Sequence, residues 1–283
     1  SDRLEAAFSS LDFSRFEPSA PASSCWQPFV WELEERDVKF AKIQIAGPMT
    51  AQWSLRVMAH PISGTREIVS MDRFPELGTQ IYRLVLAKGL AMIRRLSASG
   101  IRSMIFLDEP ALYAYSHSNP RQVLALQELK LMLQSFKKEG AVTGLHCCSN
   151  TDWKTVLGLG MDVLSLDTQL SGQSLMETCG DTVLENFLQG GGRLALGVIP
   201  TGRPGSLHAA KPNELLAQNL VLFAEKWNAR PDLIAQVLTH ALYTPACGLA
   251  LHTVADAEFI ADSLHEYHEL STQALTEKAA GSA

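Results

Sequence analysis

The most constraining feature of the sequence is an alternation of short apolar runs with longer amphipathic segments, which starts near residue 40. The short runs are typical of buried strands and comprise Ala41–Ala46, Ser103–Leu107, Val142–Cys147, Val163–Asp167, Arg193–Val198 and a last run around Leu238–Thr244. The longer segments predict helices at residues 78–98, 121–138, 152–158, 181–189, 213–228 and 255–279. This alternation favours an α/β fold with a parallel sheet and crossover helices.

The residues that follow each run favour a barrel. Glycine, proline or polar residues come at once after every strand, as at Gly47-Pro48 and Asp108-Glu109-Pro110. A (β/α)8 barrel builds its active site from these carboxyl ends of strands. We therefore predict a single (β/α)8 TIM-type barrel domain over residues 1–283, with an irregular segment at 1–40 and the barrel elements at 41–283. Six strands do not close such a barrel, so either this sequence lacks a segment or the barrel is completed in another way.

Composition excludes several classes of function. The net charge of -6 and the absence of a Lys/Arg-rich run give no general attraction for nucleic acid or anionic lipid. No apolar stretch has the length of a membrane span, and residues 1–10 lack the pattern of a signal peptide. The five cysteines are an odd number and do not resemble a secreted disulfide framework. We expect a cytoplasmic protein with reduced thiols, whose oligomeric state the sequence does not indicate.

A candidate metal site combines one histidine and two cysteines. Side chains alternate along a strand, so His146 and Cys148 share a face while Cys147 points to the other. Cys247 directly follows the last predicted strand, and these soft ligands together suit Zn²⁺. Asp167 is our candidate for a fourth, acidic ligand. The alternatives are ordinary buried residues for the His-x-Cys pair and a helix cap for Asp167.

Other polar residues at strand ends are candidates for substrate binding. At most one of Asp108 and Glu109 faces the barrel mouth; we predict that Asp108 binds a cationic amine as a catalytic and substrate-binding residue. Glu109 is expected to be hydrogen-bonded to neighbouring loops, although it too is a candidate. Ser149, next to Cys148, is another. Trp53 either presents an aromatic face at the mouth or packs in the core.

Five motifs in order resemble the C-terminal catalytic domain of cobalamin-independent methionine synthase, which belongs to the uroporphyrinogen decarboxylase/methionine synthase-like superfamily. They span about residues 40–255 and read AGPMT (46–50), LDEPAL (107–112), HCCSN (146–150), DVLSLDT (162–168) and PACGL (245–249). The resemblance implies a (β/α)8 barrel in which the six recognisable strands are strands three to eight. It also implies a zinc ion on His146, Cys148, Asp167 and Cys247, with homocysteine as the thiol acceptor and its amino group on Asp108.

Several departures from the family pattern bear on the methyl donor. The acidic zinc ligand is usually glutamate, Trp53 is displaced by one position from the folate-stacking tryptophan, and Gly197–Gly202 contains no relay histidine. We therefore expect a zinc-dependent methyltransferase of methionine biosynthesis, whose donor is a methylated corrinoid, free or protein-bound, rather than folate. The alternatives are a methylcobamide-dependent methyltransferase of a coenzyme M-like thiol and a non-catalytic homologue that binds zinc or a thiol.

Overall fold

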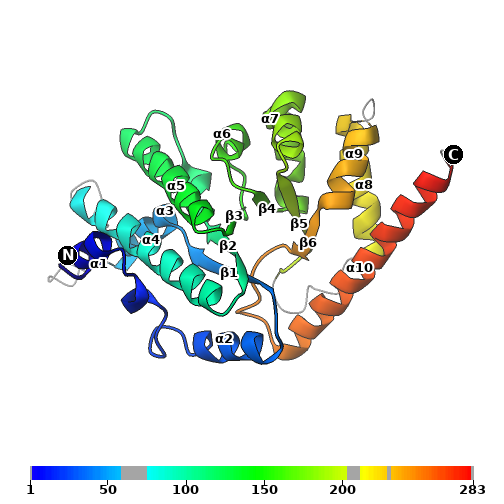
Figure 1. Ribbon diagram of the computed structural model, residues 1–283. Coiled ribbons are helices and arrows are strands. Elements are labelled where there is room, and N and C mark those ends of the chain that lie inside the picture. The colour runs from blue at the N-terminus through cyan, green and yellow to red at the C-terminus, as the bar shows by residue number, and fades with distance from the viewer. Residues whose placement is uncertain (1, 59–74, 203–210, 228–230, 282–283) are drawn as a thin grey trace. The chain divides into compact units, whose positions relative to one another are not determined.

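The computed structural model describes residues 2–58, 75–202, 211–227 and 231–281. It is an α/β protein whose strands form one sheet in chain order (Figure 1): β1 (Phe40–Ala46), β2 (Arg102–Asp108), β3 (Val142–Cys147), β4 (Val163–Asp167), β5 (Arg193–Ile199) and β6 (Leu242–Pro245). The chain divides into two compact units. Unit 1 comprises Ser1–Leu145 with Leu159–Met161, and unit 2 comprises His146–Gly158 with Asp162–Ala283.

The predicted closed eight-stranded barrel is wrong. In the described part of the chain the sheet has six strands, with β1 and β6 at the two ends of the strand order. Barrel closure requires the first and last strands to pair with each other. The prediction failed because strand-and-helix alternation also occurs in parallel sheets that do not close.

Unit 1 contains helices where an irregular segment was expected. The first 40 residues include α1 (Asp2–Ser10), η1 (Ser14–Phe16) and α2 (Trp26–Glu35), so that expectation is wrong for these ranges. The other helices of this unit are α3 (Pro48–Met58), which was not predicted, α4 (Pro75–Ala98), η3 (Pro110–Ala114) and α5 (Pro120–Lys138).

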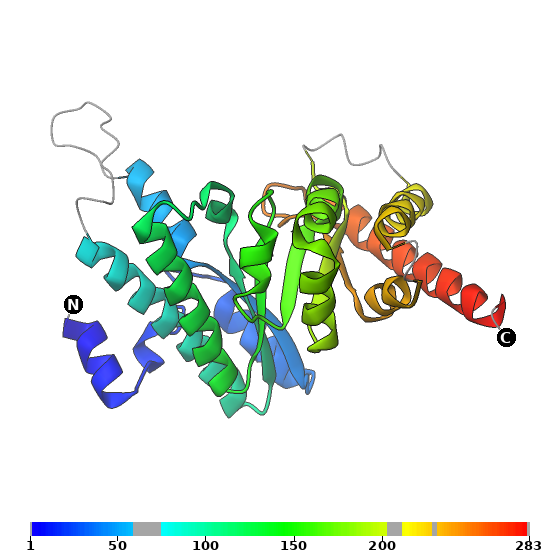
Figure 2. The same cartoon turned by 90° about the horizontal axis from the view of Figure 1, so that it is seen from above.

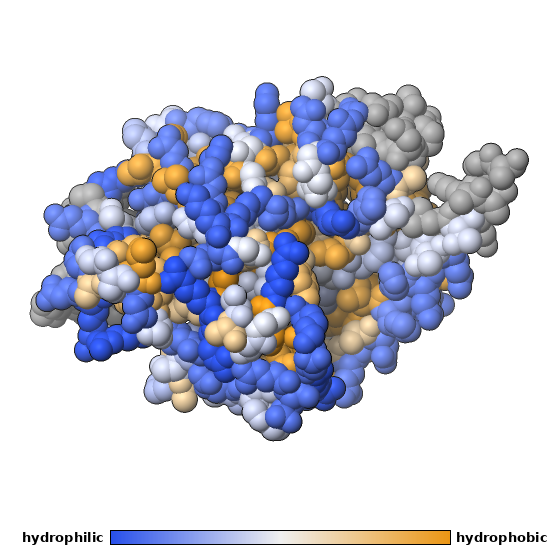
Figure 3. Space-filling view, viewed as in Figure 1, coloured by the Kyte–Doolittle hydropathy of each residue, from blue (hydrophilic) through white to orange (hydrophobic). Residues whose placement is uncertain are grey.

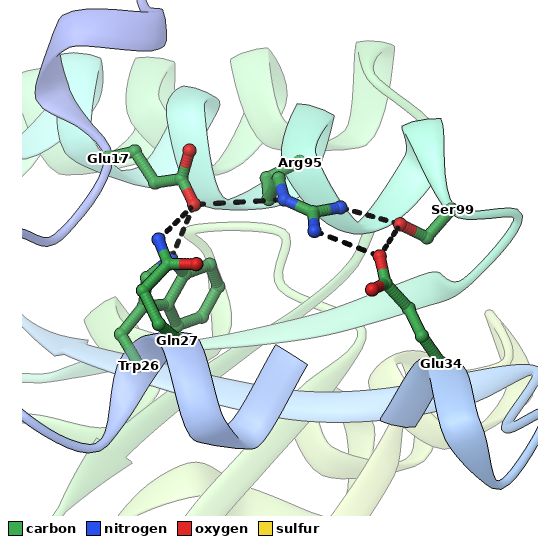
Figure 4. Close-up of polar contacts among 6 residues, drawn as sticks. All are labelled: Glu17, Trp26, Gln27, Glu34, Arg95 and Ser99. Carbon is green, nitrogen blue, oxygen red and sulfur yellow. Dashed lines mark hydrogen bonds and ion pairs between the residues drawn. The ribbon is translucent and has the colours of Figure 1, made fainter. Parts of the chain in front are cut away.

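A polar network attaches the N-terminal segment of unit 1 to α4 (Figure 4). The Arg95 guanidinium lies 2.9 Å from Glu34 of α2 and 3.8 Å from Glu17. The indole nitrogen of Trp26 donates to the Glu17 carboxylate at 2.7 Å. Because Trp26 is also buried, its ring adds apolar contact to these ionic links.

The helices α4 and α5 lie side by side in unit 1 (Figure 2), and α4 covers one face of β1 and β2. These strands are parallel and place Ile43 beside Ile105. Gly89 lets α4 approach closely, because an added Cβ would lie 2.3 Å from Phe136 of α5 and 3.3 Å from Ile105. The side chains on the other face of β1, which include those of Lys42 and Gln44, point away from α4.

Unit 2 places its helices around the parallel strands β4, β5 and β6. These helices are α6 (Trp153–Leu157), α7 (Thr168–Gln189), α8 (Pro212–Trp227), α9 (Pro231–His240) and α10 (Val254–Gly281). The prediction started α7 at residue 181, but the helix begins directly after β4. The last strand starts later than predicted, since Leu238–His240 belongs to α9.

The surface is mixed in character. Hydrophilic side chains predominate on the face shown in Figure 3, with apolar ones between them. Among the described helices, none combines the length and hydropathy that crossing a membrane requires.

Candidate metal centre

The end of β3 places His146 and Cys148 at one site in unit 2. Side chains alternate along this strand, so that Leu145 and Cys147 are fully buried while His146 and Cys148 are half-buried. The Cys147 thiol instead donates to the Ser149 carbonyl at 3.2 Å. The alternation predicted from the sequence is therefore present, and it leaves His146 and Cys148 accessible to a ligand.

Cys247 joins this pair from the segment after β6. The ligand atoms of His146, Cys148 and Cys247 all lie within 4.8 Å of one another, so this group could hold a metal ion. Gly197 of β5 helps to bring the segment in, because a Cβ there would lie 2.7 Å from the Ala246 Cα atom. The structure thus brings Cys247 to a pair of residues that precede it by 99 and 101 positions in the chain, as the sequence predicted.

Cys148 and Cys247 shift each other's pKa in opposite directions. A hydrogen bond between the two sulfur atoms, together with His146, lowers the pKa of Cys247 to about 4. The same hydrogen bond, with burial and the charge of Cys247, raises the pKa of Cys148. One thiolate therefore forms readily, and a cation would favour the second, since a divalent ion stabilises coordinated thiolates.

The sequence reasoning missed Ser165 of β4. Its hydroxyl lies 3.0 Å from Nδ1 of His146, and the serine is 7% exposed. This bond orients the imidazole and leaves Nε2 as the nitrogen available to a metal. A signal existed, because Ser165 is the one polar residue within the apolar run 163–166.

Asp167 is not in the group that could hold a metal ion. Its Oδ1 atom accepts hydrogen bonds from the backbone nitrogens of Gln169 and Leu170, both at 3.0 Å. The carboxylate therefore caps α7, which was the alternative interpretation of the sequence. Its role as a fourth ligand stays a prediction.

Asp108 and Glu109 have different surroundings in unit 1. Asp108 ends β2, and its Oδ2 atom accepts from the Gln44 amide at 3.2 Å. Glu109 is fully buried and accepts from the backbone nitrogens of Met49 and Thr50 at 3.0 and 2.8 Å, and from the Thr50 hydroxyl at 2.7 Å. Glu109 is thus hydrogen-bonded, as expected, but its partners belong to the first turn of α3 rather than to a loop, and its burial leaves no exposed surface for a substrate.

The remaining candidates lie near strand ends. Trp53 of α3 is 45% exposed and packs edge-on against Tyr113, with ring centroids 6.5 Å apart. It is therefore a partly exposed aromatic rather than a core residue. Ser149 is half-buried, and its hydrogen bond with Cys148 opposes the rise in the pKa of that thiol. Substrate binding by Asp108, Ser149 and Trp53 stays a prediction.

No protein-family model matches the chain, and no curated protein sequence matches it.

Proposed function

We propose that this protein is a zinc-dependent methyltransferase that methylates a thiol, with homocysteine as the acceptor and methionine as the product. The observation that carries the proposal is the convergence of one imidazole and two sulfur atoms within 4.8 Å. The resemblance to cobalamin-independent methionine synthase supplies the reaction.

The donor set favours zinc over other common ions. Thiolate and imidazole ligands suit Zn²⁺, whereas Mg²⁺ and Ca²⁺ require oxygen ligands. Ligands in a tetrahedral zinc shell lie roughly 3.5 Å from one another, given metal–ligand distances of about 2.0–2.3 Å. The spacing of the three residues is compatible with this shell after a small contraction.

The residues have distinct tasks in the proposed reaction. A zinc ion bound there would lower the pKa of a substrate thiol so that a thiolate is present at neutral pH. Cys148 and Cys247 supply negative charge, which keeps an adjacent sulfur electron-rich, and His146 is oriented by Ser165. The exposure of Cys247 leaves room for a substrate to approach. The acceptor sulfur attacks the methyl carbon, the bond between the methyl group and the donor breaks with its electron pair remaining on the donor, and the thiol proton passes to solvent.

The donor that we propose is a methylated corrinoid. Supporting this choice are the displaced Trp53 and the absence of histidine from Gly197–Gly202, both departures from the folate-dependent pattern. The structure places Trp53 partly in solvent, beside Tyr113.

Metal analysis tests the metal centre. We expect about one zinc ion per chain in the purified protein, and none in the double variant C148S/C247S. C25S and C147S are the matched controls, since Cys25 is exposed like Cys247 and Cys147 neighbours Cys148 but faces away from it. Zinc retained by the double variant, or lost equally in the controls, contradicts the proposed site.

Activity assays test the reaction separately. With methylcobalamin as donor, homocysteine should be methylated faster than 2-mercaptoethanesulfonate, and methyl-folate should be a poor donor. The reverse acceptor preference would identify a coenzyme M-like methyltransferase. Bound zinc with no methylation of either thiol would indicate a non-catalytic binding protein.

A further inference from the structure

The sulfur atoms of Cys148 and Cys247 contact each other directly in unit 2. Both cysteines are free thiols, a hydrogen bond joins their sulfur atoms, and these atoms lie within 4.8 Å of each other. Because a disulfide bond is about 2.0 Å long, the sulfur atoms have to approach by less than about 3 Å to form one. Rotation of one cysteine side chain between staggered positions moves its sulfur about 3 Å. A disulfide is therefore within reach of these two residues.

The backbone around Cys247 can accommodate this approach. Cys247 follows β6 and lies in neither a helix nor a strand. A Cβ added at the next residue, Gly248, would meet no atom within 4 Å, so the segment has room to adjust there. The preceding residue is anchored, because the Ala246 nitrogen donates to the Ile199 carbonyl at 2.9 Å. The adjustment therefore stays close to Cys247 and does not require β6 to move.

The other cysteines are poorly placed to compete for this bond. Cys147 and Cys148 are adjacent, so their Cα atoms are about 3.8 Å apart, which is below the roughly 4.4 Å that a disulfide normally requires. The Cys147 thiol is also buried and donates to the Ser149 carbonyl at 3.2 Å. Cys179 is buried within α7 and lies outside the clustered group, and Cys25 belongs to unit 1. The geometry therefore favours a single pair.

We propose that Cys148 and Cys247 are a site of reversible oxidation, at which hydrogen peroxide converts the two thiols into a disulfide. Cys247 is exposed and Cys148 is half-buried, so the Cys247 sulfur meets the oxidant first. This sulfur attacks one peroxide oxygen, the O–O bond breaks, and the leaving hydroxide takes up the thiol proton as water, which leaves a sulfenic acid on Cys247. The Cys148 sulfur then attacks the Cys247 sulfur, the S–O bond breaks, and the hydroxyl group leaves with the Cys148 proton as a second water. Two thiols are thereby oxidised and one peroxide is reduced.

The disulfide controls metal binding, and in this respect the inference rests on the proposed function. The thiolate is the form of cysteine that binds a metal, so the bridge removes two of the three clustered ligands and leaves only His146. A zinc ion on both sulfur atoms, in turn, occupies the electron pairs that would attack the peroxide. Oxidation and zinc binding therefore exclude each other.

Peptide mapping of the full-length, metal-free protein tests the disulfide. After treatment with one equivalent of hydrogen peroxide, the protein should lose two of its five thiols, and a non-reduced digest should contain a peptide pair that links Cys148 to Cys247. Dithiothreitol should restore all the thiols. C147S is the matched control and should form the same bridge, because Cys147 faces the other side of β3. C148S and C247S should form no intramolecular bridge.

Competition with a chelator measures the consequence for the metal. The oxidised protein should bind zinc at least about a hundredfold more weakly than the reduced protein, and zinc-loaded protein should form the bridge at least about tenfold more slowly than metal-free protein. The inference is wrong if C147S forms no bridge, if peroxide yields only sulfinic acids, or if the oxidised protein keeps its zinc affinity. A bridge in a protein whose reduced form binds no zinc would instead support the oxidation site and contradict only the proposed metal centre.

Discussion

Glu109 in unit 1 and the His/Cys group in unit 2 both follow parallel strands, but their hydrogen-bonding states differ. Glu109 is fully buried, and three donors from Met49 and Thr50 fix its carboxylate. In the His/Cys group, by contrast, Cys148 and Cys247 shift each other's pKa in opposite directions and remain accessible. A buried carboxylate whose hydrogen-bonding capacity is filled, such as that of Glu109, is typical of a structural residue. Clustered side chains that repel one another when ionised, such as the two cysteines, are typical of a ligand-binding site.

The largest effect that we expect from this comparison is on folding stability. Glu109→Ala should lower the free energy of unfolding by about 3 kcal/mol, because it removes the acceptor of the buried nitrogens at the start of α3. Chemical denaturation at pH 4.5, below the raised pKa of Glu109 in the folded state, measures the change. Asp108→Ala is the control and should cost much less, since Asp108 is only half-buried.

The pH dependence of stability provides a second readout for Glu109. Burial raises the pKa of Glu109 from 4.5 to about 7, despite the hydrogen bonds that oppose the shift. Between these values the folded state binds more protons than the unfolded state, so stability falls as pH rises, by up to about 3 kcal/mol. The difference between the unmodified protein and Glu109→Ala should therefore shrink as pH rises from 4.5 to 8. A difference that stays constant would contradict a raised pKa.

Gly197 of β5 offers a test of whether a close backbone contact positions Cys247 in the His/Cys group. A Cβ at Gly197 would lie 2.7 Å from the Cα atom of Ala246 and 2.8 Å from the Leu166 carbonyl oxygen. Gly197→Ala should therefore displace the residue before Cys247 and weaken zinc binding about a hundredfold, if the bound state carries an overpacking cost of about 2–3 kcal/mol. Competition with a chelator measures the affinity.

Gly248→Ala is the control for this experiment. It lies next to Cys247, but a Cβ there meets no atom within 4 Å. Equal zinc affinities for the two alanine variants would show that the close approach at Gly197 does not position Cys247.

Local patterns predicted most of the strands and the three clustered residues. The runs ending at Cys147 and Asp167 were predicted with their observed bounds, because short apolar segments between polar residues define strands by themselves. Sheet closure was not predictable in this way, because it depends on pairing between distant strands. The same limit explains Ser165, whose contact with His146 arises only from the neighbouring strand.

The cap formed by Asp167 shows how one residue can satisfy two patterns in a sequence. An acidic residue after a strand suits both a metal ligand and the first position before a helix. The observed start of α7 supports the role of Asp167 as a helix cap, since the helix begins at Thr168 rather than at residue 181. The backbone nitrogens at the start of that helix require an acceptor, and Asp167 provides it.

The smallest expected effect concerns the support of His146. Ser165→Ala removes the partner of Nδ1 but none of the three clustered side chains, so the zinc content should stay at about one per chain while the affinity falls about tenfold. Ser171→Ala is a suitable control, because Ser171 is equally buried in unit 2 and its hydroxyl has no hydrogen-bond partner among the described residues. Since neither serine is a proposed ligand, a tenfold loss confined to Ser165→Ala would show that imidazole orientation, and not burial of a hydroxyl, contributes to metal affinity. Equal affinities would instead mean that β3 alone orients His146.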